Sequence, residues 1–273
     1  MADLQAQIEE LWERRAELEP GDQDASQVVL EAVTMLDTGE ARVAEVVGDQ
    51  VVVHQWLKEA ILLLFRLSAM STVELGPFEF ADKIPLKGGY EKLGVRVVPG
   101  AQARFGSYLS PGVILMPSYT NIGARVGENS MVDTWATVGS CAQIGANVHL
   151  SGGVGIGGVL EPPQAAPVIV EDDVMIGSRS MIVEGSRVGR GAFVGAGTIL
   201  AGSIPVIDAE TGEELSRGVI PPWCVAVQAQ RRREFPGGEF FLPCVLVIKR
   251  LNEGERHDKA TLNDLLRQHG ITS

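Results

Sequence analysis

Aromatic side chains are scarce in this chain of 273 residues, which has only 8 Phe, 4 Trp and 3 Tyr. A core of this composition must rely on aliphatic side chains and on close packing of the backbone. Cysteine is also rare: Cys141, Cys224 and Cys244 are odd in number and widely spaced. This pattern favours neither a disulfide framework nor a zinc site. We therefore expect free thiols, a cytoplasmic protein and no metal site.

Positive charge is in the minority, because 23 Lys and Arg residues stand against 35 Asp and Glu, a formal net charge of −12. Nucleic acids and anionic membranes repel an acidic surface, so neither is an expected partner. Long apolar runs are lacking too. The longest, residues 60–65, is far shorter than the roughly 20 residues of a membrane-spanning helix. The charged, amphipathic start MADLQAQIEELWERRAELEP does not read as a signal peptide.

Glycine, in contrast, is abundant and unevenly distributed. Twenty of the 32 glycines lie between Gly94 and Gly202, and this stretch repeats every six residues. Twelve hexads each begin with an aliphatic residue, which we call the leader. The leaders are Val126, Val132, Val138, Ile144, Leu150, Ile156, Val170, Ile176, Ile182, Val188, Val194 and Leu200. A helix has a period of 3.6 and a simple strand a period of two, so neither produces this pattern.

The other hexad positions support the same interpretation. Glycine follows the leader in seven of the twelve hexads, and the fifth residue is mostly Ser, Ala or Thr. Small residues suit tight corners, and a leader at every sixth residue can stack on its equivalent one coil away. The sequence therefore predicts a β-helix of hexapeptide repeats, with the first coils near Val97. A β-sandwich with accidental spacing is the alternative.

The hexads divide the chain into a small α-rich N-terminal domain (1–93), the β-helix (94–203) and a short β/α C-terminal region (204–273). Upstream of the regular hexads the phase weakens, although Ile114 is in frame. We expect helices over 4–11, 26–36 and 55–67 and short strands over 41–47 and 50–54. The C-terminal region is expected to hold a hairpin turning at 210–212, a strand at 244–250 and a helix at 259–270.

A loop is predicted to leave the β-helix at 157–169. The leaders Ile156 and Val170 are 14 residues apart, which is not a multiple of six, and the surplus PPQAAPVI is too rich in proline to continue a ladder. We interpret the loop as part of a binding site. A mere insertion is the alternative.

Two carboxylates break the repeat at corners where glycine is preferred. Asp133 follows the leader in VDTWAT, and Glu184 replaces a glycine-centred turn in IVEGSR. Acyl transfer to an amine needs a group that takes up a proton, so both are candidates for catalysis. Among four histidines only His149 lies in the repeats, and we take it as a residue of the outer face or of a subunit contact.

Arginines near the repeats are candidates for binding a dicarboxylate, because guanidinium groups match carboxylates in bidentate fashion. These are Arg96, Arg104 and Arg179. For each of them a surface salt bridge is the alternative.

The segment LMPSYTNIGARVGENSMVDTWATVGSCAQIGANVHLSGGVGIGGVLEP resembles tetrahydrodipicolinate N-succinyltransferases of bacterial lysine biosynthesis. The resemblance continues over nearly the whole chain, through GEARVAEVV, HQWLKEAILL, GVRVVPG, DAETGEE and LPCVLVIKR. It implies a left-handed parallel β-helix, a homotrimer with active sites between subunits, succinyl-CoA as donor and no prosthetic group. The acceptor would be ring-opened tetrahydrodipicolinate.

The resemblance also implies roles for single residues. Arg96 and Asp133 match substrate-binding positions of the family, and Arg179 is placed with them. Asp133 and Glu184 would orient and deprotonate the acceptor amine, from the same or different subunits, with the choice of base left open. For coenzyme A we name Lys249, Arg250 and Lys259. The cluster Arg231 to Arg233 lies where the resemblance is weak, and either contacts phosphates or is a solvated basic face.

Three other functions compete with this prediction. A sister enzyme could use acetyl-CoA or another amino-dicarboxylate. A structural solenoid would only assemble, and predicts featureless corners without a loop. A β-helical metalloenzyme needs three converging histidines, whereas the repeats contain one.

Overall fold

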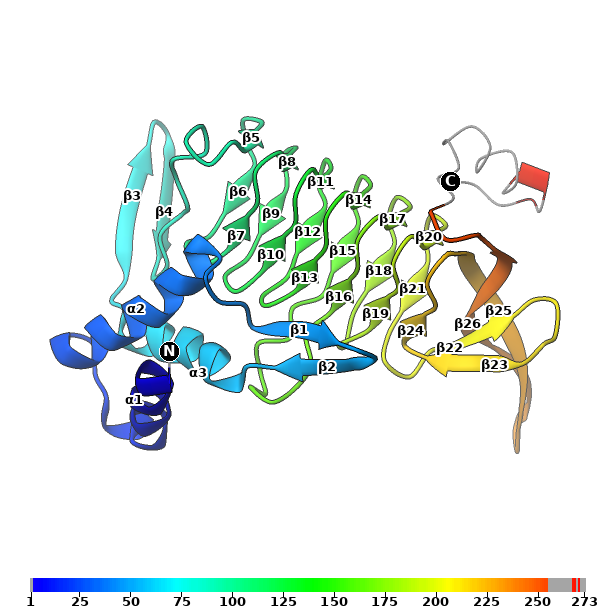
Figure 1. Cartoon of the computed structure of the whole chain (residues 1–273), viewed down its shortest axis with the longest axis horizontal. Coiled ribbons are helices and arrows are strands. Elements are labelled where there is room, and N and C mark those ends of the chain that lie inside the picture. The colour runs from blue at the N-terminus through cyan, green and yellow to red at the C-terminus, as the bar shows by residue number, and fades with distance from the viewer. Residues whose placement is uncertain (1, 255–266, 269, 271–273) are drawn as a thin grey trace.

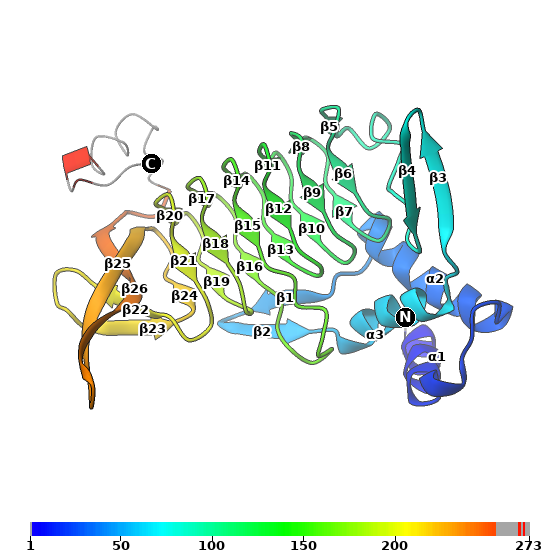
Figure 2. The same cartoon turned by 180° about the vertical axis from the view of Figure 1, so that it is seen from behind.

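The computed structural model describes residues 2–254, 267–268 and 270. Helices lie at one end, a solenoid of short parallel strands occupies the middle, and long antiparallel strands lie at the other end (Figure 1). Seen from behind, the chain keeps this linear order (Figure 2).

The N-terminal part contains α1 (Ala2–Glu13), the 3-10 turn η1 (Arg15–Glu17), α2 (Gln23–Thr38) and α3 (Gln55–Leu67). The Asp22 carboxylate accepts a hydrogen bond from the Ala25 amide at the start of α2, and Gly39 ends this helix with a φ of 83°. The hairpin of β1 (Ala44–Val47) and β2 (Gln50–Val53) precedes α3. All three helices and both strands were predicted from the sequence. α1 and α2 extend beyond the predicted 4–11 and 26–36 at both ends, and β1 begins three residues later than predicted.

A second hairpin in this part was not predicted. It consists of β3 (Ser71–Leu75) and β4 (Phe78–Asp82), joined by a turn at Gly76. Nearly every residue of both strands is exposed, including Val73 and Phe80. The region 68–93 thus consists of this hairpin followed by bends and turns, and contains no helix.

The solenoid consists of three parallel sheets. The first contains β5 (Arg96–Val97), β8 (Ile114–Leu115), β11 (Met131–Val132), β14 (His149–Leu150), β17 (Met175–Ile176) and β20 (Phe193–Val194). The second contains β6 (Gln102–Ala103), β9 (Tyr119–Thr120), β12 (Thr137–Val138), β15 (Gly155–Ile156), β18 (Met181–Ile182) and β21 (Ile199–Leu200). The third contains β7 (Tyr108–Leu109), β10 (Arg125–Val126), β13 (Gln143–Ile144), β16 (Ile169–Val170), β19 (Arg187–Val188) and β24 (Val219–Ile220).

Each hexad forms one strand and one corner. All twelve leaders are at most 2% exposed, which confirms that they fill the interior. The small fifth residues, such as Ser130 and Ala136, are buried as well. The fourth residue adopts a left-handed conformation in hexads throughout the solenoid, even where it is Asn, Trp or Arg. The repeat predicted from the sequence is thus a β-helix with a narrow aliphatic core.

Upstream the predicted phase is wrong by one residue. Leu115 pairs with Val132 and is fully buried, whereas Ile114 is its partly exposed neighbour in β8. The leader positions Leu115 and Thr120 are only five residues apart, because the corner at Pro117 is one residue short. This short repeat shifts the frame of everything before it.

The predicted loop is present at 157–168, and its last predicted residue, Ile169, is buried as the first residue of β16. Arg125 of β10 pairs with Gln143, 18 residues later, whereas Gln143 pairs with Ile169, 26 residues later. The surplus of eight residues is the number predicted from the leaders. The ladder resumes beyond the loop without a change of register.

The C-terminal region extends the first sheet. β25 (Cys224–Phe235) pairs with β20 and with β26 (Gly238–Arg250), which in turn pairs with β22 (Pro205–Asp208) of the predicted hairpin, and β23 (Glu214–Arg217) completes it. β26 contains the strand predicted at 244–250 but begins six residues earlier, and the long strand β25 that pairs with it was not predicted. The helix predicted at 259–270 lies mostly outside the described residues. None of the described helices is both long and apolar enough to cross a membrane.

The N-terminal part packs against the solenoid. The β1–β2 hairpin runs along the third sheet (Figure 1), where the Arg42 guanidinium donates to the Gln143 side chain at 3.3 Å and Arg187 donates to the Asp49 carbonyl at 3.1 Å. α3 contacts the corners at Ile122 and Cys141. In the first and second sheets most outward-facing side chains remain at least partly exposed, whereas Phe193 of β20 is buried against β25.

Candidate functional site

The turns between the first and second sheets stack into a column that we call the first edge. It includes residues 133–136 after β11, 151–154 after β14 and 177–180 after β17. Backbone hydrogen bonds join successive turns, from Gly153 to the Thr134 carbonyl at 2.8 Å and from Arg179 to the Gly152 carbonyl at 3.0 Å. Asp133 and Arg179, two predicted site residues, therefore lie on one continuous surface.

Asp133 is held rigidly at this edge. Its Oδ1 accepts hydrogen bonds from the Thr134 amide at 2.6 Å and the Thr134 hydroxyl at 3.2 Å, and its Oδ2 lies 3.5 Å from Nε2 of His149. Burial acts to raise the pKa of Asp133, but the Thr134 hydrogen bonds and His149 outweigh it and hold the pKa below its ordinary value. The carboxylate is therefore ionised and fixed in orientation by its hydrogen bonds, and 31% of its side chain remains exposed.

His149 is a residue whose role the sequence alone did not reveal. It pairs with Met131 in the ladder and projects from the outer face of the first sheet, as expected, but there it contacts Asp133. The spacing of the hexads could have indicated this contact. Residues 18 apart stack in neighbouring coils, so His149 stacks on Met131, and Met131 is two residues before Asp133. The structure thus makes a carboxylate and imidazole pair at the first edge.

Trp135 and Arg179 occupy equivalent fourth positions in their hexads. Their φ angles are 60° and 61°, a region that bulky residues rarely adopt. Trp135 is nevertheless 73% exposed, so no core packing explains its presence. The left-handed conformation is shared by fourth residues throughout the solenoid, so it is the exposure of this large aromatic side chain that marks Trp135 as a candidate surface residue.

Two arginines flank Asp133 along the first sheet. Arg96 lies on β5, two strands before β11, and Arg179 follows β17, two strands after it. At the usual spacing of neighbouring strands each backbone is about 10 Å from the coil of Asp133. Both side chains are exposed, and neither makes a hydrogen bond or ion pair with any residue that the structure describes. Arg104, in contrast, pairs with Asp82 at 2.6 Å, as the salt-bridge alternative predicted.

Glu184 lies elsewhere, on the second edge, which we define as the turns between the second and third sheets. It follows β18, has a φ of 56° and is exposed. The loop 157–168 leaves the solenoid one coil before it and the β22–β23 hairpin one coil after it. Within the described chain, no contact joins Glu184 to Asp133. The two predicted catalytic carboxylates lie on different edges of one copy.

Comparison with known proteins agrees with this architecture. A family model described as the N-terminal part of tetrahydrodipicolinate N-succinyltransferase matches residues 3–67, and one described as the hexapeptide repeat of succinyl-transferase matches residues 167–201. The 2,3,4,5-tetrahydropyridine-2,6-dicarboxylate N-succinyltransferase of Acinetobacter baylyi is 48% identical, over 98% of this chain and 99% of that protein. The chain belongs to this N-succinyltransferase family.

Other relatives support the same assignment. The proteins of that name from Methylorubrum extorquens and Dechloromonas aromatica are each 45% identical over 97% of this chain, and cover 99% and 98% of their own length. The resemblance identified from the sequence is therefore confirmed as family membership.

The three residues predicted to bind coenzyme A in this N-succinyltransferase have different surroundings. Arg250 donates to the Asp208 carboxylate at 3.2 Å, which makes it less available as a cation. Lys249 lies beside it on β26 and is half-buried, and Lys259 lies outside the described residues. Of the three, Lys249 has no ionic partner in the described part of the chain.

The cluster Arg231 to Arg233 lies on β25, at the projecting end of the long hairpin. Arg231 pairs with Glu214 at 2.9 Å, and Arg232 pairs with Glu239 and, at 3.1 Å, with Glu234. Neighbouring carboxylates thus offset most of this positive charge. The observation favours the solvated-face alternative over a phosphate site.

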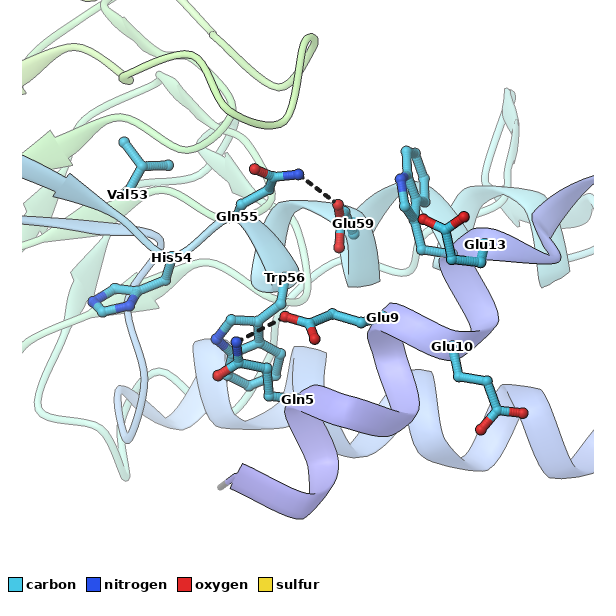
Figure 3. Close-up of a pocket in the computed structure, with 10 residues that line it drawn as sticks. Gln5, Glu9, Glu10, Glu13, Val53, His54, Gln55, Trp56 and Glu59 are labelled. Carbon is cyan, nitrogen blue, oxygen red and sulfur yellow. Dashed lines mark hydrogen bonds between the residues drawn. The ribbon is translucent and has the colours of Figure 1, made fainter.

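A cavity of about 650 Å³ lies away from both edges, between α1 and the start of α3 (Figure 3). Its lining includes Glu9, Glu13 and Glu59, together with Trp56. Its acidic lining repels dicarboxylates and phosphates alike. This cavity therefore does not suit either substrate of an N-succinyltransferase.

The loop 157–168 is fixed to the N-terminal part by a buried lysine. Lys58 of α3 is fully buried, and its Nζ donates to the carbonyls of Ala165 at 2.7 Å and Pro162 at 3.2 Å. Burial lowers the pKa of Lys58 below its usual range, with Cys141 opposing the effect. The loop is therefore anchored beside the second edge, and its Ala166 carbonyl lies 2.6 Å from where a β-carbon on Gly185 would be.

Proposed function

We propose that the protein transfers the succinyl group of succinyl-CoA to the amino group of ring-opened tetrahydrodipicolinate, in the diaminopimelate route to lysine. The products are N-succinyl-2-amino-6-oxopimelate and coenzyme A. The observation that carries the proposal is the first edge, where an ionised, hydrogen-bonded Asp133 stands between two arginines without ionic partners among the described residues. Two cations and one anion complement an acceptor with two carboxylates and one amine.

The chemistry requires proton removal from the acceptor. Its ammonium group must lose one proton before nitrogen attacks the thioester carbonyl, and a second as the carbon–sulfur bond breaks and the amide forms. One of these protons ends on the coenzyme A sulfur. Asp133 would accept a hydrogen bond from the amine and orient its lone pair, and Arg96 and Arg179 would hold the two acceptor carboxylates. His149, whose Nε2 is 3.5 Å from Asp133, would be the group that receives the proton leaving the amine.

The second carboxylate would come from another copy of the chain. Glu184 lies on a different edge from Asp133, which supports a site shared between subunits of a homotrimer. Met181 and Ile199 support the same arrangement, since these outward residues of the second sheet are 41% and 50% exposed beside Glu184. A left-handed course of the coils is part of this proposal.

The donor would lie along the same interface, with Lys249 as the predicted contact that has no ionic partner among the described residues. Succinyl-CoA acts as a co-substrate, without a prosthetic group. A cytoplasmic location belongs to the proposal, and the free and buried Cys141, Cys224 and Cys244 support it.

The test is the release of coenzyme A thiol from succinyl-CoA and from acetyl-CoA, each with and without tetrahydrodipicolinate. We expect release that depends on the acceptor and is fast only with succinyl-CoA. Asp133→Asn and Glu184→Gln should each lower kcat by about 10²–10⁴-fold with assembly unchanged, as is typical for loss of a group that handles a proton. Faster release from acetyl-CoA would show that the acyl donor is acetyl-CoA and not succinyl-CoA. Wild-type turnover in both variants would refute the catalytic assignment.

A further inference from the structure

Gly153 lies directly beneath the side chain of Arg179. A β-carbon built on Gly153 would be 2.7 Å from Cδ, 2.8 Å from Nε and 3.0 Å from Cζ of Arg179. Contacts this short do not occur, so any larger residue must displace the guanidinium. The arginine therefore lies flat across the turn of the preceding coil, in space that only glycine leaves open.

This contact determines where the positive charge is placed. Arg179 belongs to the turn after β17, yet its guanidinium lies over the turn after β14. The Gly153 amide donates to the Thr134 carbonyl, so the guanidinium stands about one strand spacing, near 5 Å, from the coil of Asp133. We infer that Gly153 is a positioning residue, which directs Arg179 toward an acceptor carboxylate at the first edge. The inference rests on the proposed function of Arg179.

Backbone conformation alone does not explain the glycine. Gly153 has a φ of 69°, but Trp135 and Arg179 adopt nearly the same φ at equivalent corners without being glycine. This edge therefore accepts other residues at the fourth position of a hexad. Gly197, one coil beyond Arg179, has a φ of 70° and nothing within 4 Å of its would-be β-carbon. Gly197→Ala thus reproduces the backbone strain of Gly153→Ala without touching Arg179.

The experiment compares these two variants by steady-state kinetics. Gly153→Ala should raise the KM for tetrahydrodipicolinate about tenfold or more, the loss expected when a charge-assisted contact is misplaced. The KM for succinyl-CoA should stay unchanged. Gly197→Ala should change both constants less than about twofold, with a similar decrease in Tm. An equal rise in the acceptor KM in both variants would overturn the inference.

A double-mutant cycle shows whether Gly153 acts through Arg179. In an Arg179→Ala background, Gly153→Ala should have no further effect on the acceptor KM. Additive effects would overturn the inference and leave the proposed function intact. An Arg179→Ala variant with wild-type KM would refute the role of Arg179 itself.

A binding measurement makes the test independent of turnover. The probe is pimelate, a seven-carbon dicarboxylate without the reacting amine, titrated calorimetrically into the wild-type and variant proteins. Weaker binding in Gly153→Ala, but not in Gly197→Ala, supports the inference even if succinyl transfer fails. Equal binding in all three proteins would contradict it.

Discussion

Replacing Lys58 by Met tests what fixes the loop 157–168. Met resembles Lys in length but has no donor, so Lys58→Met removes both hydrogen bonds to the loop without opening a large cavity. Each buried acceptor that loses its partner costs about 1–3 kcal/mol. Two effects reduce this loss of stability. Pro162 and Ala165 are not fully buried, so water can replace the lost donor, and the substitution also removes the cost of burying the Lys58 charge. We expect the free energy of unfolding to fall by about 1–3 kcal/mol.

The effect should depend on pH in a defined direction. Burial lowers the pKa of Lys58 in the folded protein, whereas the unfolded lysine keeps its ordinary pKa near 10.4. Between these two values the unfolded chain binds the extra proton, so the stability that Lys58 contributes rises with pH. The difference between wild type and Lys58→Met should therefore grow as the pH rises toward about 10.

The assay is urea unfolding followed by circular dichroism, together with limited proteolysis of the loop. Lys83→Met is the matched control, because Nζ of Lys83 is half-buried and donates to a single carbonyl, that of Phe65 at 2.8 Å. Only Lys58→Met should expose the loop to cleavage. A stability change below about 0.5 kcal/mol with a fully protected loop would refute the reasoning.

Three further results are expected. Burial raises the pKa of Cys141 and of Cys224 to about 12, so neither thiol should react with a disulfide reagent at pH 8 until the protein unfolds, and fast labelling of both would contradict the buried sites. Leu150→Ala removes a fully buried leader between Val132 and Ile176 and should cost about 2–5 kcal/mol in urea unfolding, unlike a change at an exposed site. Because the pKa of Asp133 is lowered in the folded protein, the stability that Asp133 contributes is present above a pH of about 4 and is lost as the pH falls through the folded pKa. The free energy of unfolding of Asp133→Asn should therefore differ from that of the wild type at pH 7 and approach it in acid. A difference that stays constant with pH would argue against the hydrogen bonds at Asp133.

Periodicity made the solenoid predictable, and local exceptions to it were not. Every leader from Val126 to Leu200 is buried because a fixed period allows each residue to stack on its equivalent. The frame failed at Ile114 because adjacent aliphatic residues fit either phase, and only the three-dimensional pairing selects Leu115. The β3–β4 hairpin was missed because a strand exposed on both faces carries no burial pattern.

The positions of the site residues relative to one another could not be predicted from the sequence, because they depend on contacts between coils. Asp133 and Glu184 stood out as charges at stereotyped corners, but the edge on which each lies follows only from the strand order. Arg179 was a candidate by residue type, whereas its course over Gly153 depends on a contact between coils. Likewise, Arg231 and Arg232 form a basic run in sequence and meet acidic residues in space.

The central claim is that each active site combines Asp133 of one subunit with Glu184 of another. The direct test is the activity of mixed trimers, made by co-expressing Asp133→Asn and Glu184→Gln chains with different tags and purified through both. In any such trimer one of three interfaces joins two unaltered carboxylates, so we predict about one third of the wild-type rate. If both carboxylates acted within one chain, no site would be intact. Mixed trimers as inactive as either parent would contradict the account.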